Sequence, residues 1–124
     1  MARILVVDDN AANNELMLYL LRAFDHDVEG AADGVAGLGA VRRGRFDLVL
    51  TDVLMPGIDG YELARRMKGD PRLSAIPLVA VTALAMSGDR ERIAAAGFDG
   101  YIAKPIEPES FAAQIAAYLP PADR

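Results

Sequence analysis

The chain has 124 residues, a net charge of −5 and no cysteine. This length is typical of one domain, and the apolar share of 52% supplies a sizeable core. The negative charge argues against non-specific binding to nucleic acid or anionic lipid. The absence of cysteine excludes a disulfide framework and a thiolate metal site. No apolar stretch is long enough to cross a membrane and no signal peptide precedes the first apolar run, so we expect an intracellular protein.

Short apolar runs alternate with segments of helical periodicity along the chain. Unbroken runs, rich in β-branched residues, predict strands buried on both faces of a parallel sheet. The runs are Ile4–Val7, a weaker one at Asp27–Ala31, Leu48–Thr51, Leu78–Val81 and Tyr101–Ala103. This alternation predicts an α/β domain, a doubly wound (βα)5 parallel sheet with helices on both faces.

Helical spacing marks the segments between the runs. The expected helix faces are Asn13, Leu16, Met17, Leu20, Leu21 and Phe24; Val35, Leu38 and Val41; Tyr61, Leu63, Ala64 and Met67; and, near the end, Phe111, Ile115, Tyr118 and Leu119. Asp33 and Asp59 are expected N-caps, with Gly60 easing the turn after Asp59. The segment Ser87–Ala96 has a thin apolar face, so we expect this helix to be the least firmly packed.

Five polar residues lie just past the carboxyl ends of the predicted strands. They are Asp8, Asp9, Asp52, Thr82 and Lys104. The carboxyl ends of parallel strands share one edge of the sheet, and ligands bind there in such folds. The sequence therefore predicts that these five side chains gather into one acidic site.

The chemistry of this group points to phosphoryl transfer. Neighbouring carboxylates repel each other and coexist most easily around a small divalent cation such as Mg²⁺, which prefers oxygen ligands. The Thr82 hydroxyl and the Lys104 ammonium complete a receptor for a tetrahedral dianion. Phosphoryl transfer mainly requires positioning and charge neutralisation, and a carboxylate can attack to form an acyl phosphate. We interpret the site as one for Mg²⁺-dependent phosphorylation of Asp52.

The same residues belong to a set of short motifs. In chain order these are Asp8-Asp9-Asn10, Asp52 with Met55-Pro56 and Asp59-Gly60, Thr82-Ala83, and Lys104-Pro105. Over nearly its whole length the chain resembles the receiver domain of bacterial two-component response regulators. The resemblance implies a flavodoxin-like fold with strand order 2-1-3-4-5.

The resemblance also implies roles for single residues. Asp52 would be the phosphoacceptor. Asp9, Asp52 and the backbone carbonyl of Leu54 would bind Mg²⁺, with Asp8 acting through water. Thr82 and Lys104 would bind phosphoryl oxygens.

Further implications concern switching. Tyr101 would be an aromatic switch that turns inward when Thr82 is drawn to the phosphoryl group, which would change the surface of the last two helices and the last strand. The peptide bond between Lys104 and Pro105 would be cis.

Partners and organisation follow from the same resemblance. The phosphodonor would be a sensor histidine kinase or a histidine phosphotransfer protein, and the downstream target another protein, with neither nucleic acid nor membrane as a partner. Residues 1–124 would form a single cytoplasmic receiver domain without an effector domain, a phosphoacceptor rather than an enzyme, which could dimerise on phosphorylation. The segment Thr82–Asp89 resembles both stand-alone regulators of the DivK type and receivers of hybrid histidine kinases. Leu18, off the apolar face of its helix but near the acidic edge, is a candidate docking residue for the phosphodonor.

Two other classes share parts of this pattern. A phosphatase of the haloacid dehalogenase type also uses an aspartate and Mg²⁺, but it usually carries Asp-x-Asp after the first strand. A flavodoxin-like module that binds FMN usually offers hydroxyls and amides to a phosphate in its first loop, where this chain has Asp8-Asp9.

Overall fold

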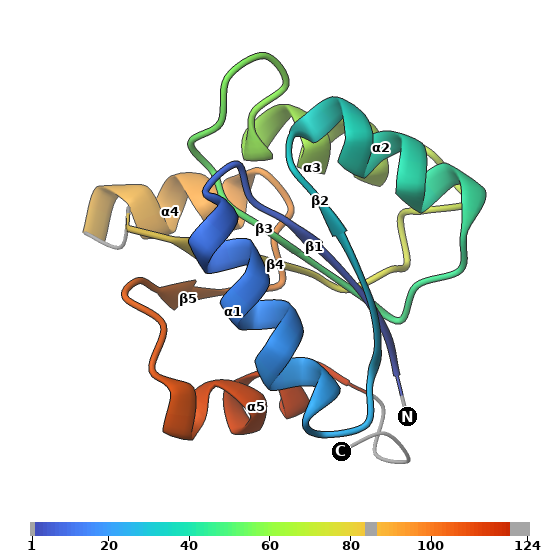
Figure 1. The fold of residues 1–124 in the computed structure, drawn as a ribbon. Helices are drawn as coiled ribbons and strands as arrows, with labels where there is room; N and C mark the ends of the chain where they lie inside the picture. Colours follow the sequence, from blue (N-terminus) through green and yellow to red (C-terminus); the bar gives the residue numbers. More distant parts are fainter. Residues whose placement is uncertain (1, 84–86, 120–124) are drawn as a thin grey trace.

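Five parallel strands form one sheet in the order β2-β1-β3-β4-β5 (Figure 1). The computed structural model describes residues 2–83 and 87–119, so the middle of the Thr82–Asp89 segment lies outside the described residues. The strands are β1 (Arg3–Val7), β2 (Asp27–Ala31), β3 (Leu48–Thr51), β4 (Leu78–Thr82) and β5 (Gly100–Ala103), and the helices are α1 (Ala11–Arg22), α2 (Gly34–Arg43), α3 (Gly60–Lys68), α4 (Ser87–Ala95) and α5 (Pro108–Ala116). The predicted fold class and strand order are confirmed.

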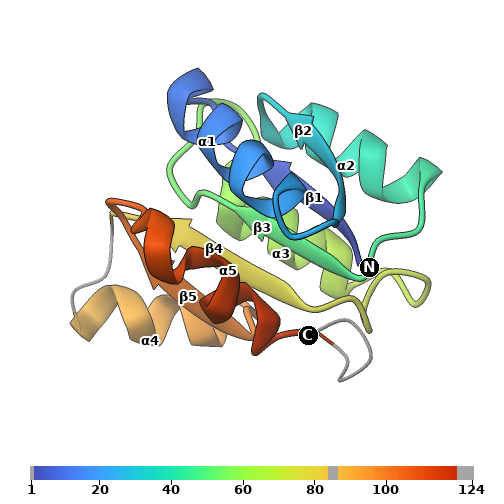
Figure 2. The same ribbon diagram turned by 60° about the horizontal axis from the view of Figure 1, so that its bottom comes forward.

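The sheet divides the core into two layers because successive side chains of a strand point to opposite faces. In β1, Leu5 and Val7 pack into a cluster with residues of α2, α3 and α4. Ile4 and Val6, on the other face, pack with residues of α1 and α5. Figure 2 shows α1 and α5 together on this second face. β3 and β4 are buried along their whole length, as their unbroken apolar sequences predict.

The predicted helix caps are present. The Asp33 side chain accepts a hydrogen bond from the Ala36 N–H at 2.8 Å, and the Asp59 side chain accepts one from the Glu62 N–H at 2.9 Å. Each cap satisfies a backbone donor that has no partner inside its helix. Asp59 therefore fixes the residue at which the loop after β3 turns into α3.

Two residues of the expected helix faces are exposed. α1 ends at Arg22, so Phe24 lies in the connection to β2 and is 62% exposed. Val35 is 64% exposed because Gly34, Gly37, Leu38 and Val41 form the buried side of α2. Gly37 packs on Val7, where an added Cβ would lie 2.8 Å from Val7 Cγ2. The prediction counted only large apolar residues and therefore placed Val35 on the wrong side.

α4 carries little buried surface, in agreement with its thin apolar face. Ile93 is the buried side chain among residues 88–95, and the others are exposed or half-buried. No helix in the described parts of the chain is long and apolar enough to span a membrane.

Candidate functional site

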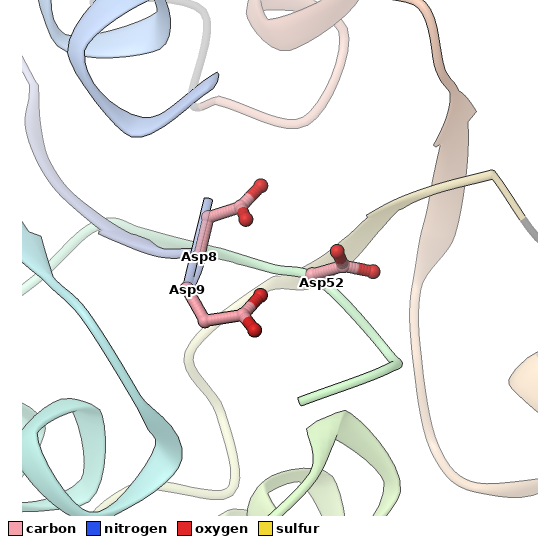
Figure 3. A group of neighbouring side chains, drawn as sticks. All are labelled: Asp8, Asp9 and Asp52. Atoms are coloured by element: carbon pink, nitrogen blue, oxygen red, sulfur yellow. The ribbon is translucent and has the colours of Figure 1, made fainter. Parts of the chain in front are cut away.

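The carboxyl edge of the sheet brings the predicted site residues together. Asp8 and Asp9 follow β1, Asp52 follows β3, and Lys104 follows β5. Thr82 is the last residue of β4 rather than the first beyond it, and it is fully buried. Figure 3 shows the three carboxylates gathered at the ends of β1 and β3.

The three carboxylates differ in exposure but lie close together. One oxygen of each of Asp8, Asp9 and Asp52 lies within 4.8 Å of the others. Asp8 is buried and Asp52 is 9% exposed, whereas Asp9 is exposed to solvent. The group is thus reached from solvent on the Asp9 side, and its other two members are held inside the protein.

Lys104 is the cation of the site. Its Nζ lies 2.8 Å from Asp52 Oδ2 and 2.9 Å from Asp8 Oδ2, so one ammonium joins the ends of β1 and β3. Burial lowers the pKa of Lys104, but the hydrogen bonds and charges of Asp52 and Asp8 outweigh burial and raise its pKa above the ordinary value. Lys104 is therefore a positive charge throughout the neutral range.

Backbone amides hold the two buried carboxylates in place. Asp8 Oδ1 accepts a hydrogen bond from the Asn10 N–H at 2.9 Å. Asp52 Oδ1 accepts one from the Val53 N–H at 2.7 Å and a longer one from the Leu54 N–H at 3.3 Å. In both residues Oδ1 bonds to its own loop, which leaves Oδ2 facing Lys104.

Gly60 is needed for a reason that its turn position did not indicate. A Cβ at residue 60 would lie 2.4 Å from the backbone oxygen of Asp52 and 2.7 Å from Val53 Cα. The Gly60 N–H donates to the Val53 oxygen at 2.9 Å. The start of α3 therefore packs directly against the backbone that carries Asp52, and the requirement at Gly60 is space for this close approach.

The residues at this edge fit a divalent cation. Three carboxylates face one ammonium, which leaves the site with an excess of negative charge. Asp8 Oδ2 is buried, and the Lys104 ammonium, 2.9 Å away, is the partner that the described residues offer it. A buried carboxylate oxygen with spare acceptor capacity, beside two further carboxylates, matches the oxygen ligands that Mg²⁺ prefers.

Tyr101 lies on β5, the outer strand at the other end of the sheet from β2. Its ring is half-buried and packs against the core cluster beneath α4. The guanidinium of Arg90, from α4, lies 5.1 Å from the ring centroid. The backbone N–H of Lys104 donates to the Thr82 oxygen at 3.0 Å, which ties the carboxyl ends of β4 and β5 together.

A pocket of about 320 Å³ opens beside the carboxylates, between the start of α1 and the end of β2. Asp8, Asp9, Asn14, Leu18 and Gly30 are among the residues that line it. Leu18 thus lies near the acidic edge, as its position in the sequence predicts. Asn14 and Gly30 were not predicted to belong to the site.

The sheet order is that of a flavodoxin-like α/β domain, and its carboxyl edge carries the acidic site. The model of the response regulator receiver domain matches residues 4–116, and the chain belongs to this family. It is a phosphoacceptor signalling domain of the two-component response regulators. These findings support neither the phosphatase nor the flavin-binding alternative.

Individual relatives extend this assignment. The chain is 38% identical over 116 residues to the polar-differentiation response regulator DivK of Brucella anthropi, with 94% of each chain covered. Its structure is similar to that of the chemotaxis protein CheY4 of Vibrio cholerae, with a TM-score of 0.91 and 28% identity over 96% of this chain and 99% of the other. It is also similar to the receiver domain of the sensor histidine kinase PA1611 of Pseudomonas aeruginosa, with a TM-score of 0.86 and 32% identity over 94% and 96% of the two chains. That receiver domain has a magnesium ion coordinated in its active-site cleft.

Proposed function

We propose that Asp52 is the phosphoacceptor of this receiver domain. The observation that carries the proposal is the position of its carboxylate, which lies beside those of Asp8 and Asp9 and 2.8 Å from Lys104 Nζ. An Asp52 oxygen attacks the phosphorus of a phosphohistidine, the P–N bond breaks, and the imidazole leaves with the bonding electron pair and takes up a proton. The product is an acyl phosphate on Asp52.

In this proposal, Mg²⁺ and Lys104 balance the negative charges of the carboxylates and of the phosphoryl group. Asp9, Asp52 and the backbone carbonyl of Leu54 hold Mg²⁺, and Asp8 acts through a water molecule. The bound cation supplies charge neutralisation for the phosphoryl oxygens. Lys104 turns from its carboxylate partners to a phosphoryl oxygen, and its raised pKa keeps it charged for this role.

The response to phosphorylation begins at Thr82 and Tyr101. The Thr82 hydroxyl moves to a phosphoryl oxygen and vacates space that the Tyr101 ring then fills. Because Arg90 of α4 lies against this ring, movement of Tyr101 alters the contact between α4 and β5. The thin buried surface of α4 supports its assignment, with β5 and α5, as the surface that changes and contacts the protein target or a second copy of the chain.

Mass spectrometry after incubation with Mg²⁺ and acetyl phosphate tests the assignment of Asp52. We expect a base-labile gain of one PO₃ group on the peptide that contains Asp52, and no gain in Asp52→Asn. Omission of Mg²⁺ should slow the labelling strongly. Modification of another residue, or none in the wild-type protein, would contradict the proposal. Release of phosphate from an ester over many turnovers would instead indicate a phosphatase.

We further propose that the phosphodonor, a sensor histidine kinase or a histidine phosphotransfer protein, docks over the pocket at α1. Leu18 lines this pocket beside the carboxylates. Leu18→Glu should slow transfer from the phosphorylated donor but leave labelling by acetyl phosphate unchanged. Phe24→Glu is the matched control, because Phe24 is exposed but lies past the far end of α1. Equal slowing with both donors would show that Leu18 acts on the site itself and not on docking.

A further inference from the structure

Asn14 has a side chain that bonds to the backbone of two strands at once. It lies near the start of α1, and its Nδ2 donates to the Asp8 backbone oxygen at 3.1 Å and to the Ala31 backbone oxygen at 3.0 Å. The Ala31 oxygen also accepts the Asp8 N–H at 3.1 Å. One amide group therefore connects the carboxyl ends of β1 and β2 at the residue where the acidic site begins.

The carbonyl that Asn14 holds belongs to the peptide group between Asp8 and Asp9. Because a peptide group is planar, fixing this carbonyl fixes the orientation of the Asp9 N–H and the direction in which the chain enters Asp9. Asp9 is exposed, so packing does little to restrain its side chain. The hydrogen bond from Asn14 is thus a specific restraint on the relative placement of the two neighbouring carboxylates.

Gly30 makes room for this arrangement. A Cβ at residue 30 would lie 2.6 Å from Asn14 Oδ1 and 3.0 Å from Leu18 Cδ1. Any larger residue would push the amide away from the two carbonyls that it bridges. The pair of a small residue in β2 and an amide in α1 forms one wall of the pocket beside Asp8 and Asp9.

We propose that Asn14 is a positioning residue that sets the geometry of the Asp8-Asp9 pair for Mg²⁺ binding. This inference rests on the proposed function, in which these carboxylates hold the cation. Asn14 does not itself contact the cation or the phosphoryl group. It acts on the ligands through the backbone, as residues outside the ligand shell of a metal commonly do.

Asn14→Leu, which removes the amide but keeps a side chain of similar size, tests the proposal. Mg²⁺ affinity, measured by calorimetric titration, should fall by about 10-fold, the lower end of the usual effect of such residues. The concentration of Mg²⁺ that half-saturates labelling of Asp52 should rise by the same factor. The labelling rate at saturating Mg²⁺ should be unchanged, because Asp52, Thr82 and Lys104 keep their places. Asn13→Leu is the matched control, since it leaves both hydrogen bonds in place.

Two further measurements separate positioning from a general loss of structure. Gly30→Ala should weaken Mg²⁺ binding in the same way while α1 retains its sequence. In the metal-free protein, the side-chain amide protons of Asn14 should exchange slowly with solvent, and Gly30→Ala should make this exchange fast.

The possible outcomes distinguish this inference from the function on which it rests. If the wild-type protein binds Mg²⁺ and is labelled on Asp52 but Asn14→Leu behaves like Asn13→Leu, the positioning role is wrong and the proposed function stands. If the wild-type protein neither binds Mg²⁺ nor accepts a phosphoryl group, both fail. A lower labelling rate for Asn14→Leu that persists at saturating Mg²⁺ would also overturn the role proposed here.

Discussion

Lys104 and a divalent cation should compete for the same carboxylates, and Lys104→Met tests this competition. Methionine keeps an unbranched side chain of similar length but removes the charge. In the structure, the ammonium lies 2.8 Å from Asp52 Oδ2 and 2.9 Å from Asp8 Oδ2. The variant should therefore be less stable than the wild-type protein without metal, yet bind Mg²⁺ more tightly.

The expected loss of stability follows from the burial of this group. The Lys104 side chain is 13% exposed, and those of Asp8 and Asp52 are 0% and 11% exposed. Removing one partner of a buried ion pair costs about 3–5 kcal/mol. We expect about 3 kcal/mol, because the exposed Asp9 side of the site allows water to reach the remaining carboxylates. This loss leaves the variant folded, since domains of this size are stable by about 5–15 kcal/mol.

The expected gain in Mg²⁺ affinity follows from the Coulomb repulsion between the ammonium and the cation. Two unit charges 4 Å apart interact by about 1 kcal/mol in water and about 4 kcal/mol at an effective dielectric constant near 20. Removing the ammonium should thus tighten Mg²⁺ binding by at least about 10-fold, or about 1.4 kcal/mol. At a Mg²⁺ concentration of about 100 times the wild-type Kd, the metal stabilises the wild-type protein by about 2.7 kcal/mol and the variant by about 4.1 kcal/mol. The difference in stability between them should shrink accordingly.

Urea unfolding in the presence of a chelator and at saturating Mg²⁺ measures both effects. Lys68→Met is the matched control, because Lys68 bonds near the amino ends of β4 and β5, at the other edge of the sheet. It should leave Mg²⁺ affinity unchanged. Since the pKa of Lys104 is raised above 10.5, the difference between Lys104→Met and wild type should persist through pH 10.5 and disappear only as the pH rises through the raised pKa. Unchanged or weaker Mg²⁺ binding by Lys104→Met, with little loss of metal-free stability, would refute the competition.

Two predictions concern the helix that follows the Asp52 loop. Glu62 bonds with Arg65 and Arg66, and the side-chain hydrogen bond from Arg65 is the largest of the effects that lower its pKa from 4.5 to about 2. Its pairing should therefore stabilise the protein fully above pH 4.5 and progressively less as the pH falls towards 2. In urea unfolding, the wild-type protein should lose its stability advantage over Glu62→Gln across that range. An NMR titration that gives Glu62 an ordinary pKa would contradict this prediction. Asp59→Ala should cost about 1 kcal/mol, because it removes the N-cap of α3, whereas Asp59→Asn should be nearly neutral; equal losses in thermal unfolding would show that charge, not capping, is what Asp59 supplies.

The sequence alone could predict that the five residues come to one edge of the sheet, because parallel strands impose a common geometry. Each acid or lysine stands where an unbroken apolar run ends, and the carboxyl ends of the strands lie at the same edge. The motif order then agreed with the family. The same reasoning placed Asp33 and Asp59 as caps, since capping depends on residue type and on a spacing of three residues.

Helix faces were predicted less well where glycine, rather than a large apolar residue, faces the sheet. Gly34 and Gly37 bring α2 close to the Ile58 backbone and to Val7. Periodicity that counts hydrophobic residues does not detect such contacts, and Val35 was misplaced for this reason. Phe24 was misplaced because α1 ends at Arg22. Phe24 lies in the turn that leads into β2, in which Asp25 has a φ of 64°.

Asn14, Gly30 and Gly60 share tertiary contacts that pattern reasoning cannot detect. Each makes a close contact with a different element, over distances that only the packed structure defines. Asparagine at the start of a helix is common for local reasons of capping, so its residue type carries no sign of a bond to β2. The carboxylates of the site follow from the sequence because the sheet aligns strand ends. Their relative angles, which decide how well a cation is held, depend on contacts between helices and strand ends, and Asn14→Leu and Gly30→Ala measure how much of the Mg²⁺ affinity comes from those contacts.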